Sequence, residues 1–248
     1  MQRFLKTALF LATGIFLYTR ITSGVINFYI NERFITLTLL AAVGIMVVGA
    51  SYWLRPSLPH DHTHDHDHDH DHDYDHNLGL TWLGLFIIAL PLVLGWLVPP
   101  QPLGAGAIGN REIGIGTLSS VAAPGSNENM GLVAGEKNIM DWLNEFQHQD
   151  LSAFVGQEAQ VIGFVYRDER FTADTFMVGR FILSCCVADA APIGLVVQTA
   201  DAAQFQVDQW VDVTGHFIVG TFAGVEMPIL VADTVVETEP PPQPYLYR

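Results

Sequence analysis

Residues 35–54 read ITLTLLAAVGIMVVGASYWL, a run of 20 residues without a charged side chain. An α-helix rises about 1.5 Å per residue, so a run of this length crosses the roughly 30 Å of hydrocarbon in a bilayer. Tyr52, Trp53 and Arg55 stand at its end, where aromatic rings and a basic side chain favour the membrane–water interface. The stretch predicts a transmembrane helix, and it therefore predicts that the chain is a membrane protein.

Two other apolar runs lie on either side of this stretch. Residues 78–98 read LGLTWLGLFIIALPLVLGWLV and are followed by a Pro-Pro pair, which ends a helix. Residues 5–23 are a less regular run, because an arginine interrupts it near its end. We interpret this run as a transmembrane helix; the alternative is a signal peptide, since two basic residues precede the apolar core.

Three crossings determine which segments share a side of the membrane. Residues 1–55 are expected to hold the first two helices and residues 78–98 the third, so the 56–77 loop lies on the side of the N-terminus. The segment 20–34 and residues 99–248 lie on the other side. Because the first helix often sets the orientation, we expect the N-terminus inside and the C-terminal domain outside.

The formal net charge of −15 is unevenly distributed. Residues 1–55 sum to +4, residues 56–77 to −7 and residues 138–248 to −11. A nucleic-acid-binding protein needs a basic face to neutralise phosphates, and the acidic C-terminal part excludes that class. Two cysteines are too few for a disulfide framework or a four-cysteine zinc site. Membrane lipid is the expected surrounding of the N-terminal part.

The loop between the second and third apolar runs carries the most specific chemical pattern. Residues 60–76 read HDHTHDHDHDHDHDYDH, in which histidines and acids alternate. Imidazole nitrogens and carboxylate oxygens suit Zn²⁺ and other divalent transition metals. Because a repeat offers many equivalent sites, the pattern indicates a metal reservoir or sensor, with zinc the first choice, rather than a catalytic centre. The candidate ligands are His60, His62, His64, His66, His68, His70, His72 and His76, with Asp65, Asp67, Asp69 and Asp71.

Two other interpretations of this loop stay open. One is a solvated linker that binds no ligand. The other is a pH sensor, because the charge of the loop is −7 with neutral histidines and about +1 when all eight are protonated. Unperturbed histidine titrates near pH ~6.5, which is within the physiological range.

Two segments rich in turn-forming residues frame the C-terminal domain. Residues 99–137 contain many Gly, Pro, Ser and Asn residues and are expected to be mostly a flexible tether, in which residues 113–121 could form a short strand. The chain ends with PPPQPYLYR at residues 240–248. This tail either docks on a partner as a polyproline II segment or, as we favour, lies over the domain with its tyrosines tucked in.

The C-terminal domain begins with one amphipathic helix. Its acids, Asp141 and Glu145, are expected on the outer face, while an apolar stripe packs on the domain. The stripe follows the i, i+3, i+4, i+7 spacing and consists of Ile139, Trp142, Leu143 and Phe146.

Five segments rich in Val, Ile and Phe follow this helix and are bounded by turn formers or acids, as β-strands are. Five strands and one helix within residues 138–248 predict a small closed or half-closed barrel of the OB type; a β-sandwich is the alternative. The expected fold class is three N-terminal transmembrane α-helices plus a C-terminal OB-like β-barrel domain. The segments are 160–166 (QVIGFVY), 175–186 (TFMVGRFILSCC), 193–198 (IGLVVQ), 210–217 (WVDVTGHF) and 227–236 (MPILVADTVV).

Cys185 and Cys186 stand side by side at the end of the second predicted strand. Adjacent residues of a strand point to opposite faces, so the simplest interpretation is one buried cysteine and its neighbour. A second interpretation is a metal site, in which one or both thiolates act with Asp189 and with His216. A third is a redox pair that closes a strained vicinal disulfide.

Catalytic signatures are not recognisable in this sequence. It contains no Ser/His/Asp motif, no phosphate-binding loop, no dinucleotide fingerprint and no H-E-x-x-H. The C-x-x-C spacing of thioredoxin-type exchange is also missing. We therefore expect a protein that is not an enzyme.

The order of these features resembles one bacterial membrane family. Two spans, a His/Asp-rich loop, a third span, a Gly/Pro hinge and a β domain with RFILSCCVADA, WVDVTGHF and a P-x-P-Y-L-Y tail are similar to the YcgQ-like proteins. The resemblance implies a multi-pass protein of the cytoplasmic membrane with a many-span permease as partner. It implies no substrate, and it marks only Cys185, Cys186 and Asp189 as candidate functional positions.

The sequence and this resemblance together predict a membrane-anchored accessory subunit of a permease that handles a transition metal. One alternative is a thiol redox protein that uses the two cysteines. The other is a non-catalytic protein of envelope interaction or assembly.

Overall fold

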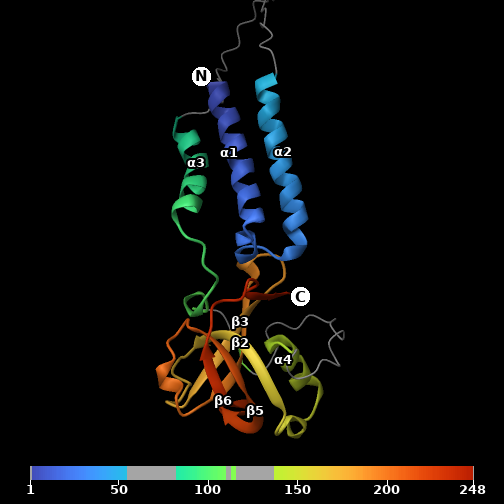
Figure 1. Ribbon diagram of the computed structural model, residues 1–248, viewed down its shortest axis with the longest axis vertical. Helices are drawn as coiled ribbons and strands as arrows, with labels where there is room; N and C mark the ends of the chain where they lie inside the picture. Colours follow the sequence, from blue (N-terminus) through green and yellow to red (C-terminus); the bar gives the residue numbers. More distant parts are fainter. Residues whose placement is uncertain (1, 55–81, 110–112, 116–136, 248) are drawn as a thin grey trace, which may run out of the picture. The chain divides into compact units, whose positions relative to one another are not determined.

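The helices and strands of the chain form two separate units. The computed structural model describes residues 2–54, 82–109, 113–115 and 137–247 (Figure 1). One unit holds Met1–Val25 and Ile35–Pro100, and the other holds Ile26–Phe34 and Gln101–Arg248. The short segment between the first two helices therefore belongs to the C-terminal unit.

Glycines allow the helices of the first unit to approach one another closely. A Cβ added to Gly49 of the second helix would lie only 2.8 Å from the Cβ of Phe10 in the first. Small residues have this role in many helix pairs of membrane proteins. The first and third helices meet where the Arg20 guanidinium donates to the Gly95 carbonyl and lies 5.0 Å from the Phe16 ring. The three helices are α1 (Gln2–Thr22), α2 (Ile35–Leu54) and α3 (Trp82–Leu97).

One helix in the described part of the chain is long and apolar enough to cross a membrane. It comprises α2 and the short turn before it, Glu32–Leu54, and many of its large apolar side chains are exposed within the unit. The apolar parts of α1 and α3 are shorter, Thr7–Thr22 and Phe86–Leu97. Three transmembrane helices are therefore not confirmed, because basic residues limit the first apolar run and the described part of the third begins at Trp82. By length and composition, α2 fits a membrane anchor or a signal sequence.

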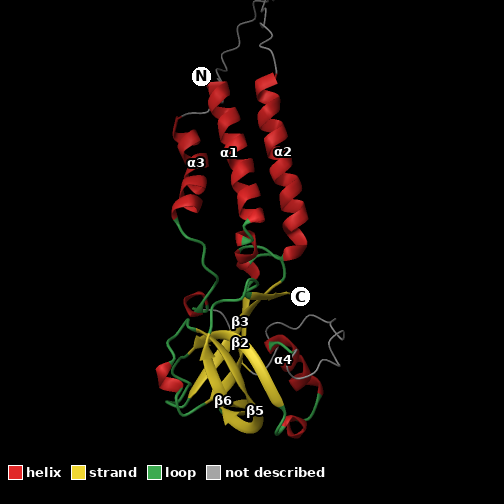
Figure 2. Cartoon of the chain, viewed as in Figure 1, coloured by secondary structure: helices red, strands yellow, loops and turns green. Residues whose placement is uncertain are grey.

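The C-terminal unit is a closed five-stranded β-barrel (Figure 2). β2 pairs antiparallel with β3 and with β5, and β5 pairs antiparallel with β6. β4 closes the barrel because it pairs antiparallel with β3 and parallel with β6. This closure confirms the predicted small barrel and excludes the β-sandwich. The strands are β1 (Gly114–Ile115), β2 (Glu158–Tyr166), β3 (Thr175–Leu183), β4 (Ala191–Gln198), β5 (Trp210–Phe222), β6 (Val225–Glu237) and β7 (Tyr245–Tyr247).

An aromatic cluster joins the helix α4 (Ile139–His148) to the barrel. Along β5, Val211, Val213 and Phe217 are fully buried, as the alternation of a strand requires. The Phe217 ring centroid lies 4.8 Å from that of Trp142 and 5.3 Å from that of Phe146, both at edge-to-face angles. The predicted apolar stripe of α4 is thus confirmed as part of the core.

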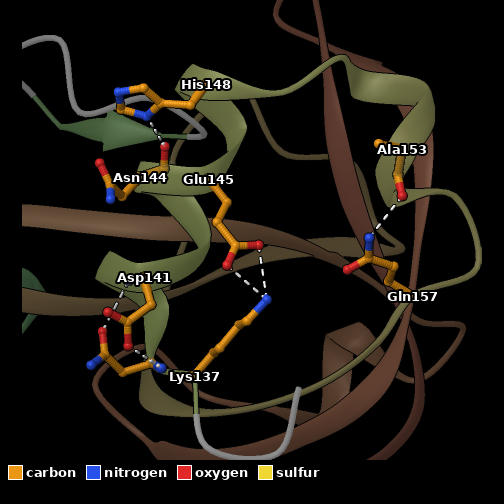
Figure 3. Close-up of polar contacts among 8 residues, drawn as sticks. Lys137, Asp141, Asn144, Glu145, His148, Ala153 and Gln157 are labelled. Carbon is orange, nitrogen blue, oxygen red and sulfur yellow. Dashed lines mark hydrogen bonds and ion pairs between the residues drawn. The ribbon is translucent and has the colours of Figure 1, made fainter. Parts of the chain in front are cut away.

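The acids of α4 are buried, whereas the sequence predicted them on the outer face. Asp141 forms a capping box with Asn138, since each side chain accepts from the other residue's backbone N–H (Figure 3). Glu145 pairs with Lys137 at 2.7 Å, and the ammonium lies 4.4 Å from the Trp142 ring. Both acids are buried because polar groups at the helix N-terminus or just before it satisfy them.

Part of the predicted tether is folded onto the barrel. Ala105 and Ile108 are buried, and the Ala105 N–H donates to the Asp208 carboxylate. Gly114 and Ile115 form β1, which pairs parallel with β4. The expectation of a mostly flexible tether is therefore wrong for residues 101–109, while the expected short strand lies within residues 113–121.

The proline-rich tail forms the strand β7 instead of a free polyproline II segment. β7 pairs parallel with the end of β3, and Tyr245 is only 3% exposed. Arg180 of β3 donates from Nε to the Pro244 carbonyl at 3.1 Å and from its terminal nitrogen to Gln243. Burial lowers the pKa of Arg180 to about 10, so the side chain stays charged at neutral pH. The favoured tucked-in tail is confirmed.

Removing the aromatic centre of the core should destabilise the barrel. We expect Phe217→Ala to lower its free energy of unfolding by about 3–5 kcal/mol, because the fully buried ring leaves a cavity. Urea unfolding of the detergent-solubilised chain, followed by tryptophan fluorescence, measures this change. Val236→Ala, at a side chain that is 60% exposed, is the control and should stay within about 0.5 kcal/mol. An equally small effect for Phe217→Ala would contradict the packing.

Candidate functional site

The loop that holds the two cysteines is shaped by one carboxylate. β3 ends at Leu183, and the chain turns through Ser184 and the short helix Val187–Asp189 before β4 begins. The Asp189 carboxylate accepts from three successive backbone N–H groups: Ser184 at 3.2 Å, Cys185 at 2.7 Å and Cys186 at 3.4 Å. Asp189 therefore uses its oxygens to fold the loop.

The two cysteines lie in the loop that follows the regular strand β3. Cys185 is exposed and Cys186 is half-buried, and neither forms a disulfide. Because the loop has left the strand geometry, the opposite-face rule for adjacent strand residues does not apply to this pair. The simplest interpretation, one buried cysteine and a neighbour, does not describe the pair.

The surroundings of the Cys185 thiol favour its protonated form over the thiolate. Its pKa is raised above the ordinary value first by the hydrogen bond with Cys186, then by partial desolvation and by the negative charges of Cys186 and Asp189. Thiol–disulfide exchange requires a thiolate, so a raised pKa slows attack by this sulfur at neutral pH. The electrostatics of the loop thus weaken the interpretation as a redox nucleophile.

The segment Ile26–Phe34, called the cover below, is hydrogen-bonded to the backbone of the cysteine loop, which connects β3 to β4. The Asn31 N–H donates to the Cys185 carbonyl at 2.9 Å, and the Val187 N–H donates to the Tyr29 carbonyl at 3.0 Å. Between these two bonds, Ile30 and Cys186 form an antiparallel β-bridge. The backbone on both sides of Cys186 is therefore fixed by a segment from the other end of the sequence.

The Asn31 side chain anchors this cover. It is 1% exposed, and its amide nitrogen donates to the Ser184 carbonyl at 3.0 Å. Its oxygen accepts from the Arg33 N–H at 3.1 Å, so both ends of the amide are satisfied. Sequence reasoning missed Asn31, since a single polar residue between two apolar runs carries no periodic signal.

A buried tyrosine of the tail ties further segments to the same region. The Tyr245 hydroxyl donates to the Phe28 carbonyl at 3.3 Å and accepts from the Leu103 N–H at 2.8 Å. Desolvation raises the pKa of Tyr245 and keeps the hydroxyl protonated. The Tyr245 side chain therefore joins three segments: the tail, the segment Ile26–Phe34 and the region around Leu103.

The predicted set of metal ligands is not assembled in one place. His216 lies on β5, where its Nδ1 is 3.5 Å from an Asp233 carboxylate oxygen. In the part of the chain that the structure describes, no three His, Cys, Asp or Glu side chains are grouped as a metal ion requires. Asp189 contacts the two cysteines through their backbone N–H groups. The candidate ligands of residues 60–76 lie outside the described residues.

Comparison with known families covers nearly the whole sequence. Family models of the DUF1980 N-terminal domain and the DUF1980 C-terminal domain match residues 3–114 and residues 118–248. A search of the curated proteins found no match.

Changing the buried amide should release the cover from the cysteine loop. Asn31→Asp keeps the shape but places a carboxylate against the carbonyls of Leu183 and Ser184, which no longer receive a donor. We expect hydrogen exchange at the Val187 amide to become at least about tenfold faster, which corresponds to roughly 1.4 kcal/mol of lost local stability. Mass spectrometry of the full chain in detergent measures the exchange.

Asn144→Asp, on the half-buried outer side of α4, is the matched control and should leave Val187 exchange unchanged. Equal exchange rates in the wild type and Asn31→Asp would show that the cover does not depend on this amide.

Proposed function

The chain belongs to the DUF1980 family, and from that premise we propose that it is a membrane-anchored accessory subunit of a permease. In this proposal the chain itself binds a divalent transition metal, with zinc as the preferred ion. The metal is collected by the His/Asp segment 60–76. The protein itself is not an enzyme in this proposal: it supplies metal binding and a barrel domain, while a many-span partner provides the transport path.

The observation that carries this proposal is the alternation of histidine and aspartate over 17 residues. Neutral imidazoles ligate zinc directly, and carboxylates either ligate or orient the imidazoles. Eight histidines within one short loop give many overlapping ligand sets, which suits storage or sensing across a range of metal concentrations.

The contacts of the cover support a chain that crosses the membrane three times. Asn31 and Ser184 are hydrogen-bonded within one unit, so the segments that contain them occupy the same side of a membrane. If α2 crosses, the chain has to cross back before residue 101. The apolar run 78–98, which includes α3, supplies this return. The His/Asp segment then lies on the opposite side from the barrel, which we place outside the cytoplasmic membrane.

The permease partner rests on the resemblance to the YcgQ-like proteins. The barrel supplies a surface for such a partner, and we assign it to the OB type because five strands close it. OB barrels often bind nucleic acid, but four Arg and 15 acids in residues 138–248 oppose that use here.

A thiol redox function is the second candidate. The free, adjacent thiols of Cys185 and Cys186 favour it, whereas the raised pKa of Cys185 and the fixed backbone around Cys186 oppose it. The metal proposal needs neither a thiolate at rest nor a change of backbone.

Titration with zinc tests the proposal. We expect the full chain in detergent to bind several equivalents of Zn²⁺ in isothermal titration calorimetry, and a variant with all eight loop histidines changed to Gln to lose them. The matched control changes Asp65, Asp67, Asp69 and Asp71 to Asn; it should keep the stoichiometry with weaker binding, because the imidazoles remain. Unchanged stoichiometry in the histidine variant would contradict the proposal.

Reporter fusions test the three-span arrangement. A reporter that is active only outside the cytoplasm should be active when it is joined after residue 248 and inactive when it is inserted within the 56–77 loop. A reporter that is active only in the cytoplasm should give the reverse pattern at the same two positions. The same sidedness for both positions would overturn the return crossing by residues 78–98.

A further inference from the structure

The C-terminal tail contacts the cover as well as the barrel. The Gln243 side-chain amide donates to the Glu32 carboxylate, and the Tyr245 hydroxyl donates to the Phe28 carbonyl at 3.3 Å. Glu32 and Phe28 belong to two different short helical turns of the cover. The tail therefore contacts the cover at two separate points.

The strand β3 anchors the same tail residues to the barrel. β7 pairs parallel with the last residues of β3, and Tyr245 and Leu246 are both buried. The Arg180 guanidinium donates to the backbone carbonyls of Gln243 and Pro244. Gln243 thus meets the barrel through its backbone and the cover through its side chain, so that the tail links the cover to β3.

The cover in turn is closed on the cysteine loop. It holds the loop by backbone hydrogen bonds on both sides of Cys186, which itself forms the β-bridge to Ile30. Cys186 is half-buried there, whereas Cys185 is exposed. We propose that residues 240–247 are a strap that controls this closure. While the strap is docked on β3, the cover stays on the loop; when the strap leaves, the cover opens and Cys186 becomes accessible. This device is independent of the metal proposal for residues 60–76.

The two tyrosines of the strap act in opposite directions. The Tyr245 hydroxyl accepts from Leu103 and donates to Phe28, so docking satisfies it. The Tyr247 hydroxyl is buried and, in the part of the chain that the structure describes, has no hydrogen-bond partner. A buried hydroxyl without a partner has lost its bonds to water, so Tyr247 opposes docking. The cost of releasing the strap is lower for this reason.

Prolines reduce the conformational entropy that the strap loses when it docks. Four of the eight residues 240–247 are prolines, and the ring of a proline fixes its backbone φ. A chain that is already restricted in its free form loses less freedom on binding. The strap therefore leaves and returns as a stiff, extended segment.

Hydrogen exchange at the Val187 amide, which donates to the cover, tests the strap in the full chain in detergent. Gln243→Glu places a carboxylate against that of Glu32 and should accelerate this exchange at least about fivefold. Gln204→Glu is the matched control, because the Gln204 amide also donates to a carboxylate, that of Asp201, on an exposed turn away from the tail. It should leave Val187 exchange unchanged. Equal exchange in the two variants would overturn the proposal.

A pair of Tyr→Phe variants tests the two directions separately. Tyr245→Phe leaves the Phe28 carbonyl and the Leu103 N–H without the hydroxyl, and should accelerate Val187 exchange at least about fivefold. Tyr247→Phe removes a hydroxyl that lacks a partner, and should leave the exchange unchanged or slower. Acceleration by Tyr247→Phe without acceleration by Tyr245→Phe would contradict the proposed strap.

Alkylation by N-ethylmaleimide, measured for each cysteine by peptide mass spectrometry, tests the control of access. In Gln243→Glu and Tyr245→Phe, the alkylation rate of Cys186 should rise in proportion to the exchange rate of Val187. Cys185 is already exposed, so its rate should stay the same and serves as a control within each molecule. Faster exchange without faster alkylation of Cys186 would show that the strap does not control access to this thiol.

A measurement on the unchanged chain covers the case that a variant is misfolded. In low concentrations of urea, the Val187 amide and the amides of β7 should open together, because the strap and the cover open as one unit. They should open well before the amide of Val213, which lies at the centre of β5 and is fully buried. Protection at Val187 that persists after the amides of β7 have opened would rule the strap out.

Discussion

A single buried amide, that of Asn31, connects the segment Ile26–Phe34 to the loop that holds Cys185 and Cys186. Its nitrogen donates to a carbonyl of the cysteine loop and its oxygen accepts a backbone N–H of its own turn. Buried amides without partners are costly, so this geometry holds only while the loop and the cover keep their places. The cysteine loop and the segment Ile26–Phe34 are held together by this contact.

The barrel, by contrast, can be predicted from local patterns of apolar residues in the sequence. Val211, Val213 and Phe217 alternate along β5 because alternate side chains of a strand face the core, and the helical spacing of Trp142 and Phe146 matches their joint packing on Phe217. Such short-range periodicity sufficed to predict every strand of the barrel. The tail, which the sequence predicts to lie over the domain with its tyrosines tucked in, pairs with β3.

The predictions that differ from the structure share one physical cause. In each, the side chain or backbone group interacts with a residue that no local sequence pattern identifies. Helical spacing alone predicts Glu145 on the outer face, whereas its partner Lys137 lies in the segment expected to be a tether. Composition alone predicts a tether around Ala105, whereas its partner Asp208 is 103 residues away. The candidate ligand set is not assembled, because β5 places the His216 imidazole beside Asp233 and, among the described residues, no three His, Cys, Asp or Glu side chains are grouped. Pairing across long separations depends on topology, which periodicity does not encode.

The contact between Asn31 and Ser184 also constrains the order in which the protein is made. The two residues are 153 positions apart, and loop closure over such separations is slow compared with the pairing of neighbouring strands. During synthesis from the N-terminus, the cover emerges long before the loop that satisfies it. Its hydrogen-bond partners are synthesised only when the loop between β3 and β4 has been completed. Docking of the cover therefore follows the completion of that loop.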